Sequence, residues 1–424
     1  MSEPLRILLS AYQCAPEMGS VSQIGWEWYS RLSREASVTL VTHIRNRERL
    51  AAAGAPLPGS EVIYIDTEWF AGPLFRLASR LFPRSQHAVF LLSSADFFVD
   101  DGAALKQLKK RRGDWDLIHA VTPVSPLAAT RLHRLGIPLI VGPWNGGLPS
   151  PPPAFPEVMR DEPSWVYRIR VIGRLLDRFF GSTRNAALIL TATRFTQQSL
   201  PPGVRTLHMI ENGVDLERFR PGEKADTRPG SDPIRVLFVG RLLPSKGVGL
   251  LLEAVALVCR EIPICLSVIG DGPCRAELER QAAERGLSDI VDFTGERSLP
   301  EVAESMRRAD VFCLPSIRES GGAVLLEAEA SGVPVIAVDS GGPAELVDDE
   351  VGRKIPAEDP KRLVEGLAAA LRDIARNREQ WRQRGIKGRR RAERLYGWNA
   401  KINRALTIYR QVLGRESQGD RVHA

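Results

Sequence analysis

Short apolar runs alternate with longer amphipathic stretches along the chain. In the first half, the runs predict strands at residues 6–11, 38–43, 61–65, 116–122, 138–142, 187–191 and 206–210. Helical periodicity lies between them, for example at 23–34 and 103–110. Strands that alternate with helices are typical of a parallel sheet covered by helices. The pattern therefore predicts an α/β domain in the first half of the chain.

The same alternation begins again after a polar interval rich in Gly and Pro. Strands are expected at 235–239, 266–269, 290–294, 311–314, 334–338 and 352–355, and helices at 249–260, 276–285, 299–307, 323–330 and 360–377. We expect two doubly wound domains, at 1–214 and 234–395, joined by a linker at 215–233. An amphipathic helix at 398–413 begins a last segment, 396–424, which is expected to return to the first domain.

The composition is that of a globular protein, and the net charge limits the classes of partner that we expect. The 424 residues are 43% hydrophobic and 26% charged, and 58 Lys and Arg against 51 Asp and Glu give a net charge of +7. This mild excess suits an anionic substrate or a phospholipid surface, and equally plain solubility. The basic residues are scattered and no recognition module is evident, which disfavours a nucleic-acid partner.

Cysteine usage and hydropathy favour the cytoplasm. The five cysteines show no C-x-x-C spacing, so neither a disulfide framework nor a zinc site is indicated. The first apolar run, at residues 7–9, suits a buried strand rather than a signal peptide. The longest uncharged stretch, 135–155, contains many Pro and Gly residues and does not predict a transmembrane helix.

Candidate binding chemistry lies in turns that follow strands of the second domain. Arg241 and Lys246 follow the first of these strands among glycines, as a diphosphate clamp requires. A surface turn with two solvated cations is the equal alternative. The Gly-Asp-Gly-Pro turn at 270–273 lacks the third glycine of a dinucleotide fingerprint, and we interpret it as a structural turn.

A third Gly-rich turn carries two glutamates. Glu319 and the Gly321-Gly322 pair precede the expected helix at 323–330, whose first N–H groups favour an anion. Glu327 lies two turns further on, partly on the apolar face. A carboxyl group there needs a partner, which the hydroxyls of a ribose can supply. The alternative is an acid at the helix N-terminus and an ordinary helical glutamate.

In this order along the chain, these motifs resemble those of a known family. The pair Glu319 and Glu327, with seven residues between them, together with Gly341-Gly342-Pro343, is similar to the donor motif of retaining GT-B glycosyltransferases of the large family 4 class. Further similarity lies in Asn212-Gly213-Val214-Asp215, in Gly25-Trp26, in Asp116-Leu117-Ile118-His119 and in Gly142-Pro143-Trp144-Asn145. The resemblance implies two Rossmann-like domains that face each other across a cleft. It also implies transfer of a sugar from a UDP- or GDP-sugar to a glycan or lipid-linked acceptor, in bacterial polysaccharide or glycolipid synthesis.

The resemblance also implies roles for individual residues. His119 and Glu319 would act at the reacting sugar, and the donor would be bound by Gly25, Arg241, Lys246, Ser320, Gly321, Gly322 and Glu327. For an isolated histidine, a place in the core or in a turn is the favoured alternative, but the motif position of His119 favours the functional role. Two positions depart from the pattern. Many relatives have an aromatic residue where Gly321 stands, and Val21-Ser22-Gln23 replaces a more usual acidic and Gly-containing run.

The expected reaction needs no metal and no cofactor. Arg241, Lys246 and helix N-terminal amides can neutralise the leaving diphosphate. An Asp-x-Asp pattern at Asp114 and Asp116 only opens a predicted strand, and we interpret it as structural. The rival classes are a nucleotide-sugar epimerase or hydrolase of the same shape and a non-catalytic sugar-binding protein. No strand is followed by G-x-G-x-x-G, which disfavours a dinucleotide-dependent oxidoreductase.

One stretch of the first domain suggests contact with an anionic membrane. Apolar residues form one helical stripe over 165–180, and Arg170, Arg174 and Arg178 lie on another face. Five cations at 106–112 add to this charge. Such a helix can lie on anionic lipid at the inner face of the plasma membrane. The alternative, which we weigh slightly higher, is that the stripe packs on the sheet and the arginines face water.

Overall fold

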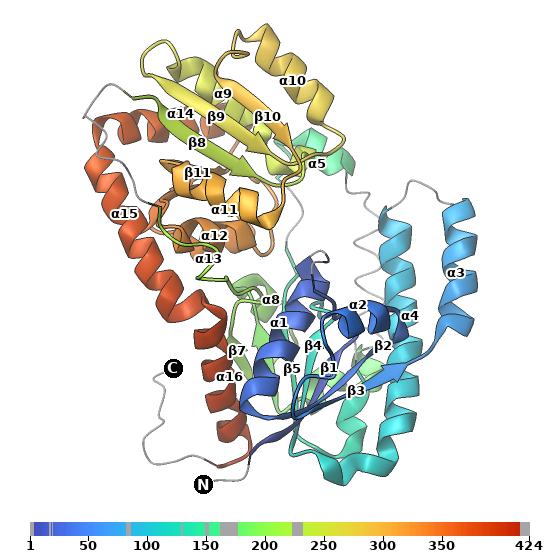
Figure 1. Cartoon of the computed structure of the whole chain (residues 1–424). Coiled ribbons are helices and arrows are strands. Elements are labelled where there is room, and N and C mark those ends of the chain that lie inside the picture. Colours follow the sequence, from blue (N-terminus) through green and yellow to red (C-terminus); the bar gives the residue numbers. More distant parts are fainter. Residues whose placement is uncertain are drawn as a thin grey trace. The chain divides into compact units, whose positions relative to one another are not determined.

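The chain forms two compact units, each built on its own parallel sheet (Figure 1). The computed structural model describes residues 4–16, 18, 20–81, 86–128, 130–148, 152–161, 177–222 and 232–415. Unit 1 comprises residues 1–147, 164–211 and 401–424, and unit 2 comprises residues 148–163 and 212–400. Most of the helix expected at 165–180 lies outside the described residues.

Unit 1 holds a seven-stranded sheet in the order β3-β2-β1-β4-β5-β6-β7, and each neighbouring pair is parallel. Its strands are β1 (Arg6–Ala11), β2 (Ser37–His43), β3 (Ser60–Ile65), β4 (Leu117–Thr122), β5 (Leu139–Trp144), β6 (Leu188–Thr191) and β7 (Thr206–His208). Every residue of β5 is buried, as expected of a strand covered by helices on both faces.

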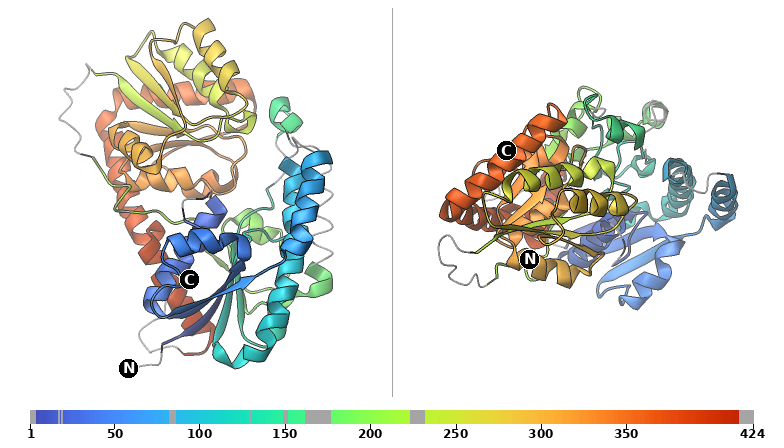
Figure 2. Two further views of the ribbon diagram at one scale, coloured as in Figure 1. Left: turned by 45° about the vertical axis from the view of Figure 1, so that its right-hand side comes forward. Right: turned by 90° about the horizontal axis from the view of Figure 1, so that it is seen from above.

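The helices of unit 1 are α1 (Ser20–Glu35), α2 (Arg47–Ala52), α3 (Glu68–Leu81), α4 (Gln86–Leu108), α7 (Ser182–Asn185), α8 (Arg194–Gln198) and most of α16 (Trp398–Val412). The sequence predicts only the last part of α4. At about 1.5 Å per residue, the 23 residues of α4 span about 34 Å, whereas a six-residue strand spans about 20 Å. Ala104, Leu105 and Leu108 pack in the core, so the first half of α4 extends past the strands (Figure 2).

Unit 2 holds a six-stranded parallel sheet in the order β10-β9-β8-β11-β12-β13. Its strands are β8 (Ile234–Val239), β9 (Ile264–Ile269), β10 (Val291–Gly295), β11 (Val311–Leu314), β12 (Val335–Val338) and β13 (Gly352–Ile355). Both sheets therefore show the strand order of a Rossmann fold, in which ligands bind where the order reverses. In unit 2 this point lies between β8 and β11.

The helices of unit 2 are α5 (Pro156–Asp161), α9 (Val248–Val258), α10 (Arg275–Glu284), α11 (Leu299–Arg308), α12 (Ala323–Ala330), α13 (Gly341–Leu346), α14 (Pro360–Arg376) and α15 (Arg378–Arg391). The sequence places 148–163 in the first domain, but their contacts group them with unit 2. A π-helix, Ala392–Tyr396, follows α15. No helix among the described residues is long and apolar enough to cross a bilayer.

Candidate active site

The loops after β8 and β11 meet at the carboxyl edge of unit 2, and their approach requires glycine. Gly247 has a φ of +66°, and a Cβ atom there would lie 2.2 Å from the carbonyl oxygen of Pro315. Beside it, the amide of Ile317 donates to the carbonyl oxygen of Ser245 at 2.9 Å. Close backbone packing therefore fixes the two loops against each other at the switch point of the sheet.

Two residues singled out from the sequence meet at this point. Lys246, which ends a 3₁₀ turn at Pro244–Lys246, donates from Nζ to Oε2 of Glu319. The amides of Gly321 and Gly322, just before α12, donate to Oε1 of Glu319 at 3.3 and 3.4 Å. Both charged side chains are largely buried, with 20% and 16% of their surface exposed. A lysine and two amides thus hold one negative charge at the start of a helix.

Two further residues of the expected donor site flank this group. Arg241, two residues beyond the end of β8, is exposed. Ser320 is half-buried, and a Cβ atom at Gly342 would lie 2.3 Å from its carbonyl oxygen. The expected cations and amides therefore come from the loops after β8 and β11 of one unit.

Glu327 lies in the second turn of α12 and is half-buried. Burial raises the pKa of its carboxyl group to about 7, and nearby Arg218 opposes the shift. Within the described part of the chain, no hydrogen bond or ion pair reaches this carboxyl group. A half-buried carboxyl group without partners among the described residues is suited to accept hydrogen bonds from a bound hydroxyl group.

A second glutamate of α12, Glu329, was not singled out from the sequence. It is fully buried and accepts hydrogen bonds from Arg391, the last residue of α15, at 2.7 and 3.1 Å. Arg391 also pairs with Asp348 at 2.9 Å. Arg391 lies 62 residues from Glu329 in the sequence, so the spacing of residues within α12 could not predict this pair. The ion pair attaches α15 to the helix that carries Glu327.

His119 lies inside the core of unit 1. It is fully buried in β4, and both ring nitrogens have partners inside unit 1. Nε2 contacts the carbonyl oxygen of Gly142 at 2.8 Å, and Nδ1 contacts the hydroxyl of Tyr409 at 2.6 Å. The ring of Trp28 packs edge-on against the imidazole, with 4.8 Å between the two ring centroids. These contacts give the ring a structural role, and its expected role at the reacting sugar stays a prediction.

Burial makes His119 a source of pH-dependent stability. Desolvation lowers its pKa from 6.5 to about 4, so the unfolded chain binds its proton at higher pH than the folded chain does. The stability that neutral His119 contributes is therefore complete above pH 6.5 and is lost as the pH falls from 6.5 toward 4. We expect the free energy of unfolding to fall by about 2 kcal/mol between pH 7 and 5 from this group. Urea titrations of wild type and His119→Gln should differ in this slope; equal slopes would contradict the assignment.

Gly25 also has a structural explanation. It lies inside α1 and not in a loop, and a Cβ atom there would lie 2.2 Å from the carbonyl oxygen of Gln13. Close packing of α1 on the segment after β1 therefore explains the glycine without a bound phosphate. The structure agrees with the helix predicted at 23–34, and the expected role of Gly25 in donor binding stays a prediction.

The Asp-x-Asp pattern is engaged in ion pairs. Asp114 pairs with Arg111 at 2.8 Å, and Asp116 pairs with Arg6 at 3.0 Å. Among the residues that the structure describes, no three His, Cys, Asp or Glu side chains converge as metal ligands. These contacts support the structural interpretation of Asp114 and Asp116.

Comparisons with known proteins agree with this architecture. Residues 37–218 match the family model "Glycosyltransferase Family 4", and residues 219–388 match "Glycosyl transferases group 1". A sucrose-phosphate synthase from Thermosynechococcus elongatus has a similar fold, with a TM-score of 0.67 and 21% identity over 97% of this chain and 100% of that one. HepE from Anabaena, solved with UDP and glucose, has a TM-score of 0.59 at 16% identity, over 95% and 99% of the two chains.

The two sheets and the solved structures define a GT-B fold. The family models go further, and the chain belongs to the family 4, group 1 glycosyltransferases. It is 35% identical over 228 residues to a D-inositol 3-phosphate glycosyltransferase from Saccharomonospora viridis, a match that covers 50% of this chain and 51% of that protein. The chain thus spans about half the length of the inositol phosphate glycosyltransferases that it matches.

Proposed function

We propose that the chain is an enzyme that transfers a sugar from a UDP- or GDP-sugar to a hydroxyl group of a glycan or lipid-linked sugar, with retention of configuration. The observation that carries the proposal is the group formed by Lys246, Glu319 and the amides of Gly321 and Gly322 at the switch point of unit 2. Family membership supports the reaction class. The UDP and glucose named in the HepE structure support the type of donor.

In the proposed reaction, the bond between the anomeric carbon and the diphosphate oxygen breaks, and a bond to the acceptor oxygen forms on the same face. Lys246 and Arg241 neutralise the leaving diphosphate, and no metal is needed. The leaving phosphate oxygen takes the proton of the acceptor hydroxyl. Glu319 stabilises the positive charge at the anomeric carbon once the diphosphate has drawn Lys246 away from it.

In the proposed complex, Glu327 binds the ribose of the donor. Its carboxyl group lacks partners among the described residues, and two neighbouring hydroxyls would supply them. Hydrogen bonds that favour the carboxylate would also lower its raised pKa. Such an enzyme would act in the cytoplasm or at the inner face of the plasma membrane, in polysaccharide or glycolipid synthesis.

Product analysis separates this proposal from its nearest rival. A panel of UDP- and GDP-sugars should be consumed slowly alone, and at least tenfold faster with sugar acceptors, with the sugar recovered on the acceptor. An epimerase or hydrolase of the same fold would turn over the donor at one rate with or without acceptors. Recovery of free sugar or an epimer, unaffected by acceptors, would therefore overturn the proposed transfer.

A further inference from the structure

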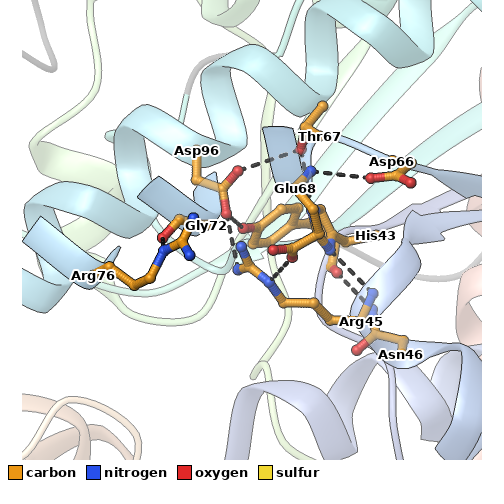
Figure 3. Close-up of polar contacts among 10 residues, drawn as sticks. His43, Arg45, Asn46, Asp66, Thr67, Glu68, Gly72, Arg76 and Asp96 are labelled. Atoms are coloured by element: carbon orange, nitrogen blue, oxygen red, sulfur yellow. Dashed lines mark hydrogen bonds and ion pairs between the residues drawn. The ribbon is translucent and has the colours of Figure 1, made fainter. Parts of the chain in front are cut away.

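Loops at the carboxyl edge of unit 1 are held in place by a side chain of a neighbouring helix (Figure 3). Asp96 of α4 is fully buried, and its Oδ2 accepts hydrogen bonds from Tyr12, after β1, at 2.6 Å and from Arg45, after β2, at 2.9 Å. Thr67, after β3, approaches Oδ1 at 3.4 Å. One helix thus fixes the ends of three strands. In unit 2, a helix supports the turn after β8 through apolar side chains instead.

A segment from the first half of the chain lies against one of the two loops of the candidate active site. Residues 148–163 belong to unit 2, although the chain on both sides of them belongs to unit 1. Their helix α5 lies beside the 3₁₀ turn Pro244–Lys246, just after β8 (Figure 1). Phe155 and Val158, three residues apart and therefore on one face, are 4% and 2% exposed, whereas Met159 is 45% exposed. One face of α5 is thus buried in unit 2, and another is open to solvent.

The contact stabilises both the helix and the turn. A helix of six residues is too short to be stable alone, so α5 depends on the surface that it covers. The turn is closed by the amides of Lys246 and Gly247, which donate to carbonyl oxygens within it at 3.0 and 3.2 Å. The amide of Ile317 donates to the carbonyl oxygen of Ser245 at 2.9 Å. A turn with few buried apolar contacts opens easily, so the apolar residues of α5 keep this one closed.

The same segment reaches the second loop of the site. Leu148, at its start, is buried, and its Cδ2 would lie 3.2 Å from a Cβ atom at Gly341. The same Cβ atom would lie 2.0 Å from the carbonyl oxygen of Glu319, and the amide of Gly342 donates to that oxygen at 3.0 Å. Gly341 thus packs on both Leu148 and the backbone of Glu319. The segment therefore supports the loops after both β8 and β11.

We propose that Leu148, Phe155 and Val158 are positioning residues of the transfer reaction. They hold the turn of Lys246 and the loop of Glu319 in the conformation that binds the donor diphosphate, and they touch no substrate themselves. A cation that is already in place saves the cost of ordering its turn when the donor binds. The assignment rests on the proposed function and extends the donor site to a segment that the sequence places in the other domain.

Calorimetric titration of the full chain with UDP and with GDP tests the positioning role. Val158→Ala and Phe155→Ala shorten buried side chains, and Met159→Ala, at the exposed residue of the same helix, is the control. For the nucleotide that wild type binds, we expect at least a fivefold loss of affinity in the first two variants, and less than a twofold change in the control. Phe155→Leu, which restores an apolar side chain, should recover most of the loss. In a Lys246→Ala chain, Val158→Ala should change the affinity by less than twofold, because its effect passes through Lys246.

Hydrogen exchange without nucleotide separates this assignment from the proposed function. In Val158→Ala, the amides of Gly247 and Ile317 should exchange at least tenfold faster than in wild type, while those of β12 stay unchanged. Unchanged exchange at the turn, an equal rise in β12, wild-type affinity in both alanine variants of α5 and its approach, or the same loss of affinity with and without Lys246 would each overturn the positioning role. A wild-type chain that binds neither UDP nor GDP would overturn the proposed function, whereas the exchange rates would still decide whether α5 holds the turn.

Discussion

Replacement of His119 by alanine is expected to lower the free energy of unfolding by about 3 to 5 kcal/mol. The change removes a fully buried ring that packs edge-on against Trp28 and Tyr409 and leaves a cavity in the core of unit 1. It also leaves the Tyr409 hydroxyl and the Gly142 carbonyl oxygen without their partner. Chemical denaturation measures the loss directly.

The control for this change is His208→Ala, at an exposed position at the end of β7. It should alter stability by no more than about 0.5 kcal/mol. The result also decides between the two roles considered for His119. A His119→Ala protein as stable as wild type that has lost turnover would support the catalytic role expected from the motif.

Replacement of Glu319 by glutamine is expected to lower kcat by about 100-fold, the usual effect of removing one preorganised electrostatic group. The substitution keeps the shape of the side chain, removes the charge that now pairs with Lys246, and replaces one acceptor oxygen by an N–H donor. The affinity for the donor should stay the same or rise, because Lys246 no longer has to give up an ion pair with Glu319 before it binds the diphosphate. Steady-state kinetics and donor titration separate these effects.

Glu365→Gln, at an exposed position of α14, is the matched control and should leave both quantities unchanged. Weaker donor binding in Glu319→Gln, with kcat preserved, would show that the carboxylate serves binding alone. It would then have no part at the reacting sugar.

Most of the fold could be predicted from the sequence because buried parallel strands are short, continuous apolar runs. All thirteen strands of the described residues were predicted, and β1, β11 and β13 match their predicted bounds. Helix α15 was not predicted, because it is polar over most of its surface and lacks an apolar stripe. Its attachment depends on long-range features: Gly385 packs on Gly332, and Arg391 pairs with Glu329.

In the candidate site too, local motifs could be predicted from the sequence, whereas long-range contacts could not. The sequence singled out Lys246 and Glu319, because cations and glycines after strands of a parallel sheet collect at one edge. It could not show that they pair with each other 73 residues apart. For His119 the motif gave no measure of burial, and the histidine belongs to the core.

The central claim is that unit 2 binds a nucleotide sugar through Lys246. Thermal and chemical unfolding with a panel of UDP- and GDP-sugars tests it most directly, with Lys361→Ala, at an exposed lysine of α14, as control. At 100 times its Kd, the true donor should stabilise wild type and Lys361→Ala by about 2.7 kcal/mol. In Lys246→Ala, binding should weaken by about 1.5 to 3 kcal/mol. Stabilisation by none of the nucleotide sugars, or equal stabilisation of well-folded Lys246→Ala, would contradict the claim.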